Sequence, residues 1–177
     1  MNAWESINER DLRQGDLLHD CRVPMLGADF GISADVEDVP LALVRLMVLT
    51  QSCDLVVRHG KSLPKAESVA LCRVYSLADY SAVRSDFAQA KVREEARKGR
   101  IEGVHLLPSL TDPKDNQTVL IAHFREIFSL PFAYLARHTE SLGDRRRLQS
   151  PYLEHFAQGF ARFFMRVGLP HDIPPYT

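Results

Sequence analysis

The stretch RLMVLTQSCDL, residues 45–55, ends an apolar run with side chains that can do chemistry. Arg45 stands at its start, and Gln51, Cys53 and Asp54 stand near its end. An arginine guanidinium is planar and binds phosphate oxygens through paired hydrogen bonds. A cysteine acts as a nucleophile in its thiolate form, which a nearby cation or helix start favours. These residue types therefore indicate phosphate chemistry, thiol chemistry, or both.

The SCD part of this stretch allows three roles. Cys53 is a candidate nucleophile or acid–base group, although no histidine lies at a spacing that would make it the base. Cys53 and Asp54 are also candidate metal ligands. Their partners would be His19 or Cys21, which share a strand face at positions i and i+2. In the third interpretation Asp54 is only a turn or capping residue. A pair of ligands is a weak indication of zinc, so we assign the chain no metal and no cofactor.

Other basic residues have similar alternatives. Arg45 is either a phosphate-binding cation or a strand cation paired with Asp38 or Asp54. His123 is a candidate general base, because histidine is the side chain that gains and loses protons near neutral pH. The run GDRRRLQS, residues 143–150, either contacts phosphates or is a solvated loop.

Composition narrows the class of protein. The chain has 177 residues, of which 45% are hydrophobic and 25% charged, which is typical of one globular domain. A formal net charge of −1 means that any nucleic-acid binding must rest on a local patch. No Walker loop, GxGxxG, HExxH or GxSxG motif occurs, which argues against nucleotide-driven and common hydrolase chemistry.

The sequence also bears on where the protein works. No apolar stretch approaches the roughly 20 residues that a membrane helix needs. The first residues, MNAWESINERDLRQGD, have neither a basic start nor an apolar centre and do not resemble a secretion signal. Three cysteines without a CxxC spacing fit no disulfide framework. We therefore expect a cytoplasmic protein without a membrane partner.

Apolar runs bounded by turn formers predict the strands that must position these residues. The first begins at QGDLL, residues 14–18, after a Gly-Asp turn. The runs LALVRLMVLT, ESVALCRVYSL, GVHLLPSL and TVLIAHFREIFSL predict further strands, at residues 41–50, 67–77, 103–110 and 118–130. The segment 27–40 is rich in turn formers and acids and predicts a surface loop.

Two helices are indicated. Strong helix formers with mixed charge predict an inserted helix over about 83–99, which Gly99 ends. A wide apolar stripe predicts an amphipathic C-terminal helix over about 151–167, with Ser150 as its N-cap. Gly168 and Pro170 give its stop. The fold class is therefore α+β, a single domain over residues 1–177, built as a small β-barrel with a helix packed on it.

The order of these pieces resembles the PemK/MazF family, SH3-like barrels known as toxins of bacterial toxin–antitoxin pairs. QGDLL resembles the opening "GD-V" strand, RLMVLTQ the "RP-LVI" strand, and VALCRVYS the "IVAPIT" strand. TVLIAHFREIFSL resembles the "V-L-QIRTID" strand, and YLEHFAQGFARFFMRVGLP is similar to the closing helix. The resemblance touches most of the chain in the right order.

The resemblance implies a metal-independent endoribonuclease that acts on single-stranded RNA as a homodimer, either a toxin or a defence-associated nuclease. It maps the arginine that stabilises the transition state onto Arg45. It maps the hydroxyl of "PIT" onto Ser76, or onto Tyr75 if the register shifts by one. Cys53 and Asp54 are added as candidate catalytic residues. The candidate RNA-binding residues are Gln51, Arg73, His123 and Arg125.

Some features depart from the family pattern. Leu46 stands where the family has proline, the loop over residues 21–40 is long, and the helix near 83–99 and the SCD turn look like additions. An alternative function is therefore a non-catalytic interaction module. It would bind a cognate partner protein or nucleic acid through the loop and the QSCD turn.

Overall fold

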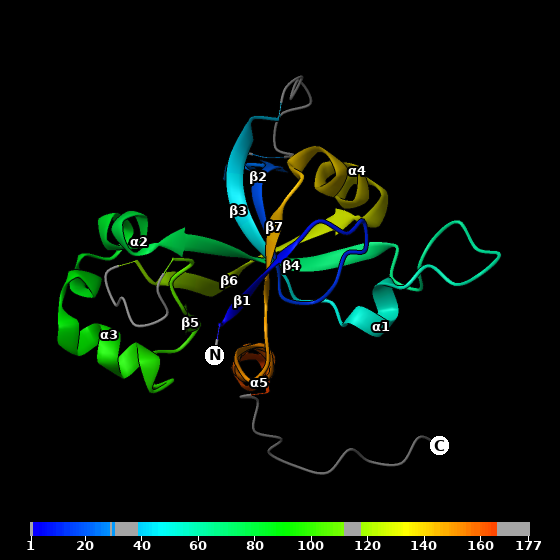
Figure 1. Ribbon diagram of the computed structural model, residues 1–177. Coiled ribbons are helices and arrows are strands. Elements are labelled where there is room, and N and C mark those ends of the chain that lie inside the picture. Colours follow the sequence, from blue (N-terminus) through cyan, green and yellow to red (C-terminus); the bar gives the residue numbers. More distant parts are fainter. Residues whose placement is uncertain (1, 29, 31–38, 112–117, 166–177) are drawn as a thin grey trace, which may run out of the picture.

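The computed structural model describes residues 2–28, 30, 39–111 and 118–165 (Figure 1). Their strands form a seven-stranded antiparallel sheet in the order β1-β7-β2-β3-β4-β6-β5. The strands are β1 (Trp4–Ile7), β2 (Asp16–Pro24), β3 (Leu41–Val48), β4 (Ser68–Ser76), β5 (Val104–Leu107), β6 (Leu120–Pro131) and β7 (Arg145–Leu148). The α+β class is confirmed.

The sheet is not closed into a barrel. Within the described ranges, β1 and β5 are its two edges, and each pairs with a single neighbour. The edge strand β5 is contacted by helices α3 (Ala90–Arg97) and α5 (Tyr152–Phe164) and pairs with no second strand among the described residues. The closed barrel predicted from the sequence is therefore wrong, and the molecule is an open sheet with helices on both faces.

The other helices are α1 (Ser52–Leu55), α2 (Leu77–Val83), the short 3-10 helix η1 (Ser85–Ala88) and α4 (Phe132–Leu142). The insertion predicted over about 83–99 is broken into η1 and α3 and is preceded by α2 (Figure 1). The predicted C-terminal helix is present as α5, but it begins at Tyr152 with Pro151 at the N-cap position, so the prediction of Ser150 as its N-cap is wrong. Its expected last residues, up to 167, and its stop signals at Gly168 and Pro170 lie outside the described residues.

Two apolar cores flank the sheet because its central strands bury both faces. Met47 of β3 packs toward α5, where Phe156 is fully buried. Its neighbour Leu46 packs on the other face, toward Leu135 of α4. A third cluster joins α2 and η1 to the end of β4 and β6 around Tyr80. Apolar runs in β3 and β4 thus reflect burial on both sides of the sheet.

No helix within the described parts of the chain is both long enough and apolar enough to span a bilayer.

Candidate functional site

A large irregularity in the pairing of β4 with β6 builds the candidate site. Cys72 pairs with Ile127, but the next residue, Arg73, pairs with His123. Three residues of β6, at positions 124–126, therefore have no partner on β4. Such bulges bend a strand and re-aim its side chains. Here the bulge brings the carboxylate of Glu126 back toward the side chain of His123.

Four polar side chains meet at this bulge, and we call them the Glu126 cluster: Arg73, Tyr75, His123 and Glu126. The Glu126 carboxylate accepts hydrogen bonds from the Tyr75 hydroxyl at 2.6 Å and from Arg73 Nη1 at 3.1 Å. It lies 2.9 Å from Nδ1 of His123. The Arg73 guanidinium also lies over the Tyr75 ring, 4.4 Å from its centroid. The cluster joins a cation, a carboxylate, an imidazole and a phenol on neighbouring strands.

The protonation of the cluster follows from these contacts. Burial alone would raise the pKa of Glu126, but hydrogen bonds from Tyr75, His123 and Arg73 outweigh it and lower the pKa. Burial, and then the bond to Glu126, raise the pKa of Tyr75, so its hydroxyl keeps its proton. An ionised carboxylate can only accept hydrogen bonds, so Nδ1 of His123 carries the hydrogen. In neutral His123 the other nitrogen, Nε2, is then free to take up a proton.

The His123 ring is held but accessible. Its centroid lies 5.6 Å from that of Tyr80 and 6.3 Å from that of Tyr75, so aromatic rings flank it. Its side chain keeps 18% of its surface exposed, and Arg73 keeps 29%. Among the described residues, Nε2 of His123 has no hydrogen-bond partner. A positioned imidazole with one free nitrogen can act as a general base, and the arginine beside it can bind an anionic substrate group.

The structure brings together only some of the predicted residues. Arg73 and His123, both predicted to bind RNA, meet in the Glu126 cluster. Tyr75, the one-residue alternative to Ser76, joins them. Ser76 has a structural role, because its hydroxyl oxygen accepts a hydrogen bond from the Asp79 backbone N–H at 3.1 Å and caps α2.

Arg45 makes its hydrogen bond outside the Glu126 cluster. Its Nε donates to Nδ1 of His19 at 3.1 Å, where β2 and β3 are out of register. Burial, and then the charge of Arg45, lower the pKa of His19. The predicted pairing of Arg45 with Asp54 does not occur, since Asp54 binds Lys65 at 2.8 Å. The other predicted partner, Asp38, lies outside the described residues.

The QSCD turn is structural in its contacts. Residues 52–55 form α1, and the backbone N–H of Asp54 donates to the Gln51 carbonyl at 3.0 Å. The Asp54 carbonyl in turn accepts from the backbone of Ala66 at 2.9 Å. Cys53 is exposed, and its thiol lies 3.7 Å from the Gln51 side-chain oxygen. These contacts favour the turn interpretation of Asp54.

The metal alternative gains no support from side-chain placement. Within the described residues, no group of three or more His, Cys, Asp or Glu side chains is arranged to hold a metal ion. Nδ1 of His19 accepts a hydrogen bond from Arg45, and Cys21 is buried.

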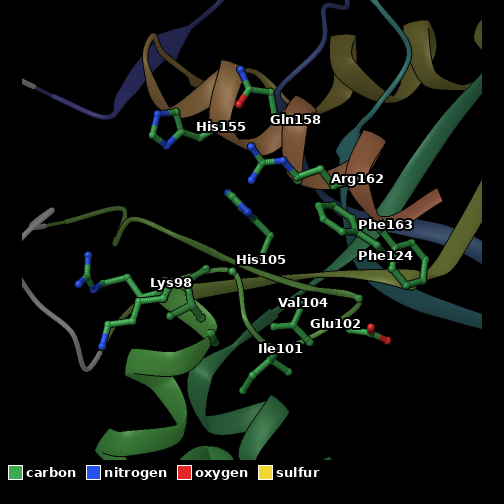
Figure 2. Close-up of a pocket in the computed structure, with 16 residues that line it drawn as sticks. Lys98, Ile101, Glu102, Val104, His105, Phe124, His155, Gln158, Arg162 and Phe163 are labelled. Atoms are coloured by element: carbon green, nitrogen blue, oxygen red, sulfur yellow. The ribbon is translucent and has the colours of Figure 1, made fainter. Parts of the chain in front are cut away.

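Arg125 also lies outside the Glu126 cluster. Its guanidinium is 5.4 Å from the centroid of the Phe163 ring and 3.9 Å from the Glu102 carboxylate. Phe163 and Glu102 line a cavity beside α5 (Figure 2), so Arg125 contacts two residues of that cavity's wall. The predicted RNA-binding residues thus divide among three places in the molecule. Arg73 and His123 lie in the Glu126 cluster, Gln51 lies at the start of α1, and Arg125 lies beside Glu102 and Phe163.

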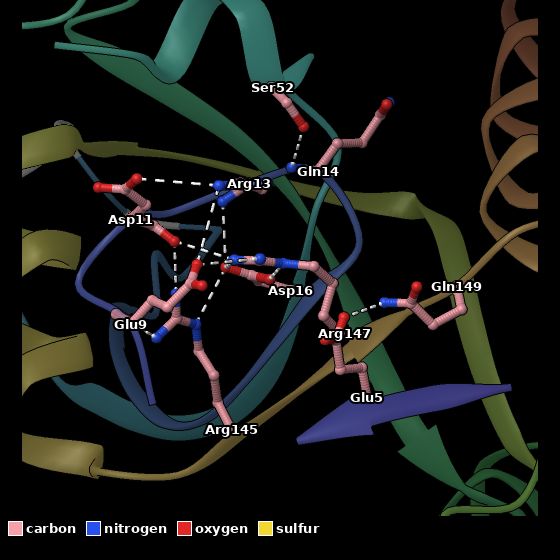
Figure 3. Close-up of polar contacts among 10 residues, drawn as sticks. All are labelled: Glu5, Glu9, Asp11, Arg13, Gln14, Asp16, Ser52, Arg145, Arg147 and Gln149. Carbon is pink, nitrogen blue, oxygen red and sulfur yellow. Dashed lines mark hydrogen bonds and ion pairs between the residues drawn. The ribbon is translucent and has the colours of Figure 1, made fainter. Parts of the chain in front are cut away.

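Within the arginine run of residues 143–150, strand β7 covers Arg145–Leu148, so the run is not a solvated loop. Two of its three arginines face inward and the third, Arg146, is half-buried. Arg145 is 2% exposed and Arg147 is 7% exposed. Both side chains point toward Asp16 (Figure 3). Arg145 Nε donates to Asp16 Oδ2 at 3.0 Å, and Arg147 Nη2 donates to the same oxygen at 3.1 Å. Both arginines also donate to the Asp11 carbonyl. These two arginines hold the segment before β2 in place and are unavailable to phosphates.

Sequence reasoning did not identify Glu126. It lies three residues after His123, a spacing that puts two side chains on opposite faces of a regular strand. Only the bulge makes them neighbours, and no proline or glycine in β6 marks that bulge. The sequence did offer one indication of this site: a His and a Glu occur in the same predicted strand, and an Arg occurs in another predicted strand.

Comparison of the chain with protein-family models, with curated proteins and with solved structures found no match.

Proposed function

We propose that the protein is an endoribonuclease that cleaves single-stranded RNA at the Glu126 cluster. The observation that supports this proposal is the 2.9 Å contact between His123 Nδ1 and a carboxylate that also binds Arg73. This arrangement gives a base and a fixed cation side by side. The proposal keeps the activity that the resemblance to PemK/MazF proteins implies, but it assigns that activity to different residues. The resemblance itself remains a prediction.

The first chemical step requires a base. Nε2 of His123 takes the proton of a ribose 2′-hydroxyl, and the 2′-oxygen attacks the neighbouring phosphorus. The bond from phosphorus to the 5′-oxygen breaks, and solvent supplies a proton to that oxygen. The products are a 2′,3′-cyclic phosphate and a 5′-hydroxyl. Glu126 stabilises the imidazolium that forms on His123, as a carboxylate does when it orients a catalytic histidine.

The developing negative charge requires a cation. Arg73 uses Nη1 to bind Glu126, which leaves the hydrogens on Nε and Nη2 to bind phosphate oxygens. A cation that is already fixed needs little rearrangement during the reaction, which makes it effective in stabilising the transition state. Tyr75 is a positioning residue, since its hydroxyl holds the same carboxylate at 2.6 Å.

The test is RNA cleavage in EDTA, with cyclic phosphate ends as the readout. Loss of a general base costs about 10²- to 10⁴-fold in rate, and we expect this for His123→Asn. Asn can still donate to Glu126, so folding should be retained. Arg73→Ala should lower the rate comparably. Arg45→Ala is the matched control, because it removes the arginine that the sequence first indicated, and it should cleave like the wild type.

Two results would contradict the proposal. Intact RNA after long incubation with the folded wild type would remove the activity altogether. Loss of cleavage in Arg45→Ala, with full cleavage in His123→Asn, would move the site to β3.

A non-catalytic protein-binding module is the second candidate, and exposed apolar side chains on β3 favour it. Leu41 and Leu43 are 62% and 64% exposed, and Met25 and Leu26 beyond β2 are 43% and 57% exposed. Large exposed apolar side chains that gather on one surface often mark interaction sites. The homodimer implied by the resemblance would have a suitable face here. Sedimentation of Leu43→Asp against the wild type would reveal such a dimer.

A further inference from the structure

A cavity of about 360 Å³ opens on the face of β6 opposite the Glu126 cluster. Its walls are the end of α3 with the turn that follows, strand β5, and helix α5 (Figure 2). Phe124 lines it, whereas the preceding residue, His123, points into the Glu126 cluster. The volume is within the range of about 300–1,000 Å³ that small-molecule sites occupy.

The cavity is lined by cations from two opposite walls. Arg97 and Lys98 come from the end of α3, and Arg162 comes from α5. Arg97 and Lys98 are partly neutralised by Glu94, at 2.7 and 3.4 Å. Arg162 is exposed and, among the described residues, has no hydrogen bond or ion pair. Its guanidinium therefore keeps all its donors for a ligand.

The acid of the lining does not cancel this charge. Glu102, the acid of the lining, lies 3.9 Å from the guanidinium of Arg125, so it already has a cation as its partner. His155 and Gln158 of α5 add donors to the same wall as Arg162 (Figure 2). The net character of the lining is cationic.

His105 supplies a neutral polar group at the base of the cavity. Burial, and then the nearby His155, lower the pKa of His105 to about 4, so its ring is uncharged near neutral pH. The ring stacks on Phe124, with centroids 6.1 Å apart. It also packs so closely on α5 that a Cβ added to Gly159 would lie 2.9 Å from its Nδ1. The helix therefore fixes the ring in the cavity wall.

We propose that this cavity binds the phosphate monoester of a nucleotide, with Arg162 as its principal anchor. A phosphate monoester carries about two negative charges, whereas an internal phosphodiester carries one. The doubly charged group is better suited to a cavity with cations on two opposite walls. Gln158 and His105 add neutral hydrogen bonds. Two molecules carry this group, a free mononucleotide and the phosphorylated end of an RNA strand. The site does not depend on the nuclease proposed at the Glu126 cluster.

The experiment is calorimetric titration at low salt with AMP, with adenosine as the ligand that lacks the phosphate. We expect AMP to bind and adenosine to bind far more weakly. Arg162→Gln should weaken AMP binding by about tenfold or more, because it removes a charge-assisted hydrogen bond. Lys91→Gln is the matched control, since it removes one exposed positive charge from α3 outside the cavity, and it should bind like the wild type.

A second variant tests the cavity by shape instead of charge. Gly159→Ala pushes the His105 ring toward the ligand space and should reduce AMP binding with no change in net charge. A thermal melt checks that this variant is folded. His123→Asn should bind AMP normally, which separates this site from the nuclease.

Two 2′-O-methyl trinucleotides, with and without a 5′-phosphate, distinguish the sources of the group without being cleaved. Preference for the phosphorylated one indicates a strand end, and binding of AMP alone indicates a free nucleotide. Equal binding of AMP and adenosine, or equal effects of Arg162→Gln and Lys91→Gln, would overturn the proposal.

Discussion

At the scale of single residues, the arginines of this chain have three different roles. Arg145 and Arg147 are buried structural groups, Arg73 is half-buried in a polar cluster, and Arg162 is exposed beside a cavity. Residue type alone does not separate these roles. Arg73 and His123 could be selected from the sequence because they fall in strand runs. Glu126 could not, because its contact with His123 depends on a bulge.

The buried carboxylate of Asp16 gives a prediction at this scale. Asp16→Asn would leave Arg145 buried without a counter-charge, and Arg147 would keep only the exposed carboxylate of Glu9, 3.7 Å away. Removing one partner of a buried ion pair costs about 3–5 kcal/mol, and we expect a loss of this size in the free energy of unfolding. Urea denaturation measures it. Asp11→Asn is the control. The Asp11 carboxylate is 77% exposed, and its ion pair with Arg13 is long, at 3.9 Å, so its loss should change the free energy of unfolding little.

At the scale of elements, apolar runs were enough to predict β2 to β6 and the C-terminal helix. Strands β1 and β7 were missed. β7 has the sequence Arg-Arg-Arg-Leu, whose charges hide the fact that alternate side chains face inward. Helix α4 was missed because it follows β6 directly, with Pro131 as its N-cap and no turn between them. In each case packing elsewhere in the molecule decides the local structure.

Ser76 gives a prediction at the element scale. Its hydroxyl caps α2, so Ser76→Ala should lower the free energy of unfolding by about 1 kcal/mol. The same change should leave the rate of RNA cleavage close to that of the wild type, because Ser76 has no contact with the Glu126 cluster among its hydrogen bonds. Chemical denaturation and the cleavage assay measure the two effects. A large loss of cleavage with little loss of stability would return Ser76 to the catalytic residues.

At the scale of the whole molecule, the sheet is open where the sequence predicted a barrel. An open sheet and a barrel give the same pattern of apolar runs, because the sequence of a strand indicates only which of its faces are buried. Closure depends instead on what lies beside the two edge strands. Here α3 and α5 contact β5, and no sequence motif of the chain indicates that they do so.

His105 lies where β5, β6 and α5 meet, and its burial there predicts how the free energy of unfolding depends on pH. The pKa of His105 falls from its usual value near 6.5 to about 4, mainly through burial among β5, β6 and α5. The unfolded chain therefore binds a proton more readily than the native chain between these values. The contribution of His105 to stability is complete above about pH 6.5 and is lost as the pH falls toward about 4. The loss is at most roughly 3 kcal/mol.

Denaturation of the wild type and of His105→Leu at several pH values measures this effect. The other charged and titratable groups around the ring are the same in both proteins: His155, which acts on it directly, and Arg97, Lys98, Glu102 and Arg162, which line the same cavity. As the pH falls below 6.5, the wild type should lose stability relative to His105→Leu, because only the wild type has the histidine that takes up a proton on unfolding. A difference that stays constant from pH 7 to pH 4 would show that His105 has no such role.

The pairing of β1 with β7 has a consequence for synthesis on the ribosome. Trp4 is aligned with Leu148, so β1 is synthesised long before β7, its partner within the described sheet. The nascent chain must hold β1 unpaired until β7 has been made, and a truncated product that ends before β7 keeps β1 unpaired permanently. Such fragments should be recognised by chaperones and proteases long before the complete chain is.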